Sequence, residues 1–207
     1  MENEQNNEMT AQESLSLITE TLNNSRKEIT HRSGKHFILW GALLTFFSLL
    51  VYILCKTTGR EVWNWLWFAL PAIGFPLSRL LFRKDTTARV QNDVSRITGG
   101  IWMAFCVFAC SVAAFTMLYA ELSSNIIGVI AATVNLTSEI VLLFGLAECI
   151  TGVALKNWVV KIAGIITGIG GITIIYVTSA NEEQLFVFTF AGLVLMLTGL
   201  IVKLQYK

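Results

Sequence analysis

Two glutamates lie in a strongly apolar stretch of the chain, LTSEIVLLFGLAECITGVALK, which runs from Leu136 to Lys156. Glu139 and Glu148 are the side chains there that could do chemistry, because a carboxyl group among apolar residues can take up a proton or pair with a cation. On a helix, a spacing of nine residues turns the two carboxyls to opposite faces and separates them by about 13.5 Å along the axis. They therefore cannot share one proton as a close pair of acids does.

Glu148 is predicted to lie inside a helix bundle. Its helical face also carries Gly145 and Gly152, small residues that let a neighbouring helix approach closely. An ionised carboxylate without a partner is costly in such a place, so Glu148 should either be neutral or pair with a cation. The candidate cations are Arg79 and Lys161.

Two roles stay open for Glu148. It could couple the protein to the movement of a proton or ion, or it could be a polar contact between packed helices, which the sequence favours. Glu139 shares its face with Asn135 and is expected within about one turn of the outer surface, where water reaches it. The candidate polar site within the apolar segments therefore consists of Glu148, Glu139, Arg79 and Lys161.

The composition indicates a membrane protein. Hydrophobic residues make up 54% of the 207 residues and charged residues only 14%, whereas soluble domains carry about 25% charged residues. The mean hydropathy is +0.63. The formal net charge is +1, and the cations are scattered between apolar runs, so the sequence predicts no nucleic-acid partner.

Six apolar runs are long enough to cross a hydrocarbon core about 30 Å thick as helices. Backbone amides in lipid have to be paired internally, and in these runs this favours helices over strands. The runs are residues 37–55, 62–82, 97–120, 126–155, 162–178 and 185–202. The expected fold class is all-α: a polytopic membrane protein with six transmembrane helices and a short N-terminal amphipathic helix.

Two of these runs depart from a plain span. Residues 126–155 would form a helix of about 45 Å, longer than the membrane is thick. We therefore expect the true span to begin near Asn135. In residues 62–82, Pro71 and Pro76 should kink the helix, because proline removes a backbone donor and clashes with the preceding turn.

The distribution of basic residues predicts the orientation. Thirteen of the fifteen lysines and arginines flank the six runs on one side, and the other side keeps only Lys56 and Arg60. Basic flanks are retained in the cytoplasm, so both termini are predicted to be cytoplasmic.

The chain divides into a polar segment, residues 1–35, and the apolar bundle, residues 36–207. Apolar residues recur within the polar segment at helical spacings of three, four and seven. This stripe is Leu15, Ile18, Leu22 and Ile29. It could lie on the bilayer, pack beneath the bundle or bind another protein.

Glycines in the last two runs predict close helix packing. Gly164 and Gly168 form a GxxxG motif, and Gly192 and Gly199 are seven residues apart. Small residues at such spacings let helix backbones approach one another. We therefore expect the last three spans to pack tightly.

The remaining reactive side chains do not form a site that predicts catalysis or metal binding. His31 and His36 stand at the predicted cytoplasmic entrance of the first span, and no HExxH or GxSxG pattern occurs. The cysteines lack the paired spacing of zinc or redox sites; they are Cys55, Cys106, Cys110 and Cys149. No cofactor is predicted.

Several stretches resemble a family of multi-span bacterial inner-membrane proteins to which no activity is assigned. They are ESLSLITETLNNSRKEI leading into FILWG, WNWLWFALPAIGFPLSRL, and ITGVALKNWVVKIAGI. The resemblance implies a location in the bacterial inner membrane and gives no catalytic residues.

These patterns favour a non-enzymatic membrane protein that acts by binding, as a scaffold or regulator of a cytoplasmic or membrane partner. The amphipathic helix and the arginine-rich segment around residues 79–96 are the expected contact regions, besides membrane lipid. The alternative is a small transporter or channel that couples an ion or proton through Glu148. The sequence does not determine the oligomeric state.

Overall fold

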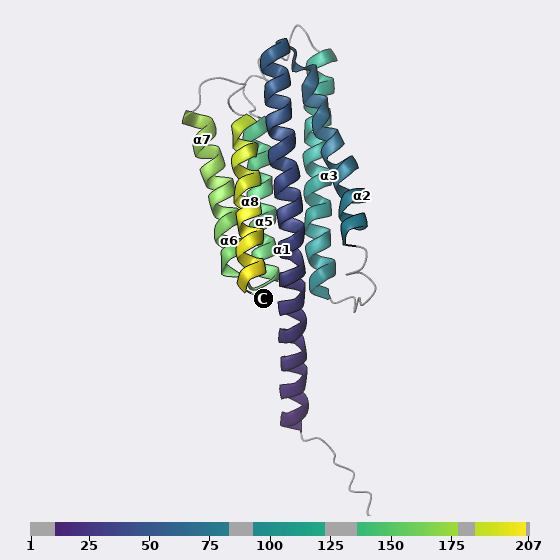
Figure 1. Ribbon diagram of the computed structural model, residues 1–207, viewed down its shortest axis with the longest axis vertical. Helices are drawn as coiled ribbons and strands as arrows, with labels where there is room; N and C mark the ends of the chain where they lie inside the picture. The colour runs from purple at the N-terminus through teal and green to yellow at the C-terminus, as the bar shows by residue number, and fades with distance from the viewer. Residues whose placement is uncertain (1–10, 83–92, 123–135, 178–184, 206–207) are drawn as a thin grey trace, which may run out of the picture.

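The computed structural model describes residues 11–82, 93–122, 136–177 and 185–205 (Figure 1). Every regular element within these ranges is a helix, which confirms the predicted all-α class for this part of the chain. Five helical stretches are long enough and apolar enough to cross a membrane. They are Gln12–Thr58, Arg96–Thr116, Leu136–Ala154, Trp158–Val177 and Phe186–Gln205.

The longest element is α1 (Ala11–Thr58), a single helix of 48 residues and about 72 Å at 1.5 Å per residue. The sequence predicted a short helix and a separate first span, but the structure joins them without a break at residue 35. Gly34 does not end the helix, because it is buried against the backbone of Gly199. The N-terminal part of α1 extends well past the other helices, at the end of the bundle where α8 (Phe186–Gln205) finishes (Figure 1).

The predicted span 62–82 consists of two elements. A 3-10 helix, η1 (Glu61–Phe68), is followed by α2 (Ala69–Leu81). Pro71 stands in the first turn of α2, where a missing backbone donor is tolerated, and Pro76 lies inside the helix. The change of helix type therefore comes just ahead of the prolines that predicted a kink.

The next helices are α3 (Asp93–Leu122) and α5 (Leu136–Ala154). Residues 126–135 lie outside the described part of the chain, so the expectation that this span begins near Asn135 stays a prediction. The following span is continuous from Trp158 to Val177 but changes type twice. It consists of α6 (Trp158–Ile165), a π-helix called η3 (Ile166–Gly170), and α7 (Gly171–Val177).

The turn between α5 and α6 is fixed by Asn157, which is buried. Its side-chain oxygen accepts hydrogen bonds from the backbone amides of Val159 at 2.9 Å and Val160 at 3.3 Å. Its Nδ2 donates to the side chain of Gln205 at 3.3 Å. Asn157 thus caps α6 and ties this turn to the end of α8.

The antiparallel helices α1 and α8 form the most extensive contact in the structure. Gly41 faces Gly192, and a Cβ atom added to Gly41 would lie 2.6 Å from the carbonyl oxygen of Gly192. Two turns further along α1, the Ser48 hydroxyl donates to the carbonyl of Leu185 at 2.7 Å and pairs with the Thr189 hydroxyl at 2.8 Å. The glycines of α8 that predicted close packing therefore meet α1, the first span.

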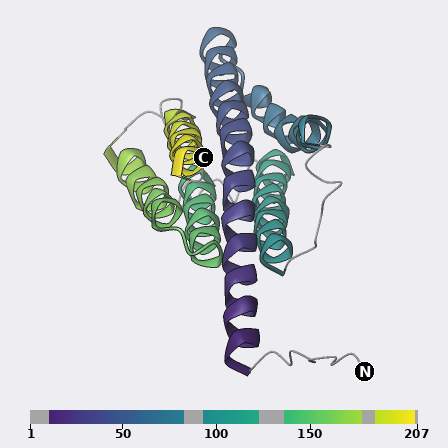
Figure 2. The same ribbon diagram turned by 60° about the horizontal axis from the view of Figure 1, so that its bottom comes forward.

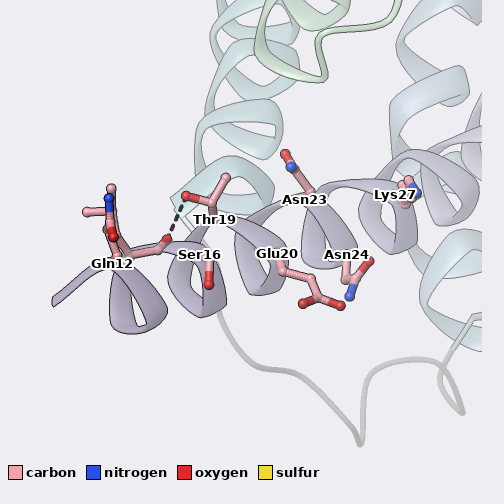
Figure 3. Close-up of a pocket in the computed structure, with 8 residues that line it drawn as sticks. Gln12, Ser16, Thr19, Glu20, Asn23, Asn24 and Lys27 are labelled. Carbon is pink, nitrogen blue, oxygen red and sulfur yellow. Dashed lines mark hydrogen bonds between the residues drawn. The ribbon is translucent and has the colours of Figure 1, made fainter. Parts of the chain in front are cut away.

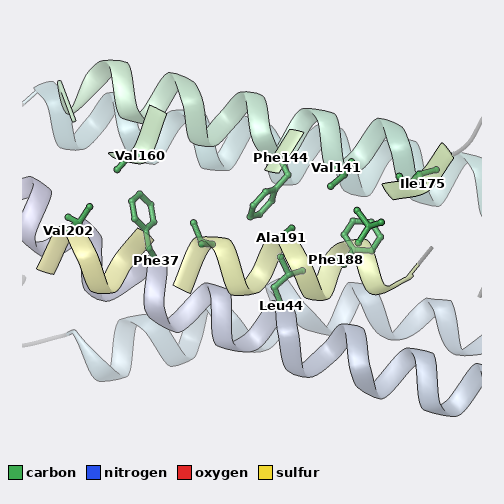
Figure 4. Close-up of a cluster of buried hydrophobic side chains, with 11 residues drawn as sticks. Phe37, Leu44, Val141, Phe144, Val160, Ile175, Phe188, Ala191 and Val202 are labelled. Carbon is green, nitrogen blue, oxygen red and sulfur yellow. The ribbon is translucent and has the colours of Figure 1, made fainter. Parts of the chain in front are cut away.

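Buried apolar side chains fill the space between α1, α5, the α6–α7 span and α8 (Figure 4). The cluster includes Phe37, Leu44, Val141, Phe144, Val160, Ile175, Val187, Phe188, Ala191, Leu195 and Val202. On the other side of α1 lie α2 and α3 (Figure 2). Trp102 and Phe105 of α3 pack edge-on against Phe144, with ring centroids 5.5 and 5.4 Å away.

Replacing Gly41 with alanine should destabilise the bundle. The new methyl group would meet backbone atoms of Gly192 and Met196 that cannot move independently, and overpacking of this kind costs about 1–3 kcal/mol. Gly99→Ala is the matched control, because a Cβ at Gly99 has no atom within 4 Å. Thermal unfolding of both purified variants checks this, and equal midpoints for the two would contradict it.

Candidate functional site

The structure separates the four residues of the predicted polar site. Glu148 is fully buried, Glu139 is exposed in the first turn of α5, Arg79 is exposed near the end of α2, and Lys161 is half-buried on α6. The ammonium group of Lys161 lies over the ring of Trp158, 4.5 Å from its centroid. No ion pair joins either candidate cation to Glu148 in the part of the chain that the structure describes.

Threonines take the place of the predicted cation. The Thr167 hydroxyl donates to Oε2 of Glu148 at 3.2 Å. Thr198 of α8 lies beside the same carboxyl group, and its hydroxyl donates to the carbonyl of Val194 at 2.8 Å. All three side chains are buried, and Oε1 of Glu148 has no hydrogen-bond partner among the described residues. We call Glu148, Thr167 and Thr198 the Glu148 cluster.

Glycines bring the backbones around this cluster into direct contact. A Cβ atom on Gly145 would collide with the backbone of Gly168, and one on Gly164 with the backbone of Cys149. On the next turns of the two helices, Gly152 faces the backbone of Lys161. This confirms that the GxxxG motif is a packing motif, and it explains why the carboxyl of Glu148 is sealed inside.

Thr167 stands in the π-helix η3. A π-turn carries one more residue than an α-turn, and such turns occur frequently at functional sites. The turn places a buried hydroxyl against the acid while Gly168 remains against α5. It therefore combines a hydrogen bond with a close helix contact on one short segment.

Sequence reasoning missed Thr167 and Thr198. The signal was present, because Thr167 follows Gly164 by three residues and Thr198 follows Leu195 by three, so each shares a helical face with a residue that packs inside the bundle. A hydroxyl at such a position usually bonds its own helix backbone, as Thr198 does. Only the packing of the helices decides which of the two hydroxyls also donates a hydrogen bond to Glu148.

The apolar stripe of the N-terminal segment is the second candidate site. Leu15, Ile18 and Leu22 are exposed by 68%, 57% and 50% on the part of α1 that extends beyond the bundle. Ile29 is half-buried, and the next residue, Thr30, is buried. We call Leu15, Ile18 and Leu22 the exposed stripe; these three side chains do not pack beneath the bundle.

A shallow open hollow runs along the projecting part of α1 next to the exposed stripe (Figure 3). Thr19 at its edge donates its hydroxyl to the carbonyl of Leu15 at 2.8 Å. Most of the lining side chains carry hydroxyl, amide or charged groups; the lining is Gln12, Leu15, Ser16, Thr19, Glu20, Asn23, Asn24 and Lys27. This part of α1 therefore presents an apolar edge and a polar side to its surroundings.

Replacing Thr167 with valine should weaken the bundle by about 0.5–2 kcal/mol, because the shape is kept while Glu148 loses the hydroxyl that donates to its Oε2. Thr173→Val on α7 is the matched control, since that hydroxyl is exposed and bonds the carbonyl of Ile169. Chemical denaturation in mixed micelles measures both, and a loss at Thr173 equal to that at Thr167 would argue against the role of the cluster.

A comparison of the chain with protein-family models, with curated proteins and with solved structures found no match. Within the described residues, no group of three or more histidine, cysteine, aspartate or glutamate side chains is arranged to hold a metal ion. The described part of the chain thus presents two candidate functional features, the exposed stripe and the Glu148 cluster.

Proposed function

We propose that this chain is a non-enzymatic protein of the bacterial inner membrane that binds a protein partner through the exposed stripe on α1, as a scaffold or regulator. The proposal includes six spans and cytoplasmic termini. The observation that carries it is the stripe itself: three large apolar side chains, each at least half exposed, on a helix that continues into the bundle. Covering such side chains is favourable, by about 25 cal/mol per Å² of apolar surface.

The sixth span of this proposal is η1 followed by α2. Eight residues of 3-10 helix and thirteen of α-helix extend over about 35 Å, enough for a hydrocarbon core about 30 Å thick. Figure 1 draws the two elements alongside α1 and α3. The end of α8 lies on the same side of the bundle as the projecting part of α1 (Figure 1). A chain with both ends on one side of a membrane crosses it an even number of times, which agrees with six spans.

The orientation proposed here follows from the charges at the two ends of the bundle. The end of α2, the start of α3 and the end of α8 lie at the end of the bundle from which α1 projects, and the end of α1 lies at the other (Figure 1). The first three carry Arg79, Arg96 and Lys203, and the end of α1 carries Lys56. Basic residues are retained on the cytoplasmic side. The exposed stripe would then face the cytoplasm, within reach of soluble and peripheral proteins.

A photoreactive amino acid in the stripe should identify the partner. Placed at Ile18, it should give one protein cross-link in cells, and placed at Asn24, on the opposite face of the same exposed helix, it should give none. The triple change Leu15→Ser, Ile18→Ser and Leu22→Ser should remove co-purification of that protein. Equal cross-linking from both faces, or cross-links to lipid alone, would refute the proposal.

A second candidate function is ion or proton coupling through Glu148, and the buried, unpartnered Oε1 favours it. Flux into liposomes that contain the purified chain tests this candidate. Glu148→Gln should reduce proton or ion flux at least tenfold, whereas Glu139→Gln, at an exposed position of the same helix, should leave it unchanged. Flux that is the same in both variants would exclude the transport role.

A further inference from the structure

An ionised carboxylate at Glu148 would have too few hydrogen-bond donors around it. A carboxylate only accepts hydrogen bonds, through about four lone-pair positions, but the cluster gives it one hydrogen, from Thr167. The Thr198 hydroxyl uses its hydrogen for the carbonyl of Val194, and Thr151 on the next turn of α5 uses its own for the carbonyl of Ala147. Oε1 is left buried without a donor.

A proton on Oε1 corrects this imbalance. The protonated acid carries no charge, so it does not need the several donors that a buried carboxylate requires. Oε2 still accepts from Thr167. In the neutral form, the cluster keeps this hydrogen bond and avoids the cost of a buried charge.

The charges on the neighbouring helices do not offer another solution. The basic side chains on the elements packed against α5 are Lys161 on α6, Lys203 on α8 and Arg96 on α3, and none forms an ion pair with Glu148. Lys161 lies over the Trp158 ring, and the other two are exposed. The further titratable groups on α3 include the thiols of Cys106 and Cys110, which bring no positive charge.

We propose that the Glu148 cluster is a proton-binding site, in which Oε1 carries a proton in the folded protein where α5, η3 and α8 meet, with Thr167 and Thr198 beside the acid. A proton needs one acceptor, whereas a metal cation needs a shell of several oxygen ligands. The site differs from the proposed partner-binding stripe, and it does not require that anything is transported.

Infrared spectroscopy of the full chain in lipid vesicles tests the site at pH 7. The wild type should show the carbonyl stretch of a protonated carboxyl group. Glu148→Gln should lose that band, because glutamine keeps a similar shape with an amide in place of the acid. Glu139→Gln is the control and should keep the band. Identical spectra for the wild type and Glu148→Gln would overturn the proposal.

Two further measurements cover the other outcomes. If Glu148→Gln does not fold, the wild type labelled with ¹³C-glutamate tests the proposal instead. The carbonyl band should be present at pH 7 and should shift in frequency with the label. Absence of the band would overturn the proposal. Exchange of choline chloride for sodium chloride at constant pH should leave the band unchanged. Loss of the band in sodium chloride would show that a metal cation, and not a proton, occupies the cluster.

Discussion

Backbone contact at glycine sets the geometry of this bundle. On α1, Gly34, Gly41 and Ser48 follow one another at intervals of seven residues. Their partners are Gly199 and Gly192 of α8 and Leu185 just before it, which run in the opposite direction at the same interval. Seven residues make nearly two helical turns, so the same face of each helix meets the other along its whole length. A side chain at either glycine pair would force the helices apart, and the core in Figure 4 would open with them.

The same kind of contact determines what Glu148 can be. Because Gly145 and Gly164 bring the backbones of α5 and the α6–η3 segment together, the acid has no room for a long cationic side chain beside it. Short hydroxyl side chains fit between helices that lie this close, and those of Thr167 and Thr198 are buried there. Polar contacts between apolar helices contribute modestly, about 0.6 kcal/mol on average. The close glycine contacts therefore supply the packing, and the Glu148 cluster adds a hydrogen bond between α5 and η3.

Much of the fold could be predicted from the sequence, but less of the candidate site could. Hydrophobic runs and helical periodicity located the apolar helices, and Gly164 and Gly168 were recognised as a packing pair. Glu148 was expected inside because its face carries glycines. Of the two outcomes expected for Glu148, a neutral acid or a pair with Arg79 or Lys161, the structure does not show the pair. Charge complementarity can be read from the residues, but which helix lies next to which cannot. The continuity of α1 across residue 35 was also missed, since the change from polar to apolar composition does not by itself end a helix.

Composition and spacing alone determined that the chain forms apolar helices, which residues on each helix are small, and that one acid lies on a glycine face. These properties are local, because they follow from side-chain type and the 3.6-residue repeat. The tertiary structure alone decided that α8 pairs with α1, that a π-turn holds Thr167 against Glu148, and that Leu15, Ile18 and Leu22 stay uncovered. These are contacts, or missing contacts, between segments far apart in the chain, and they depend on how all the helices pack at once.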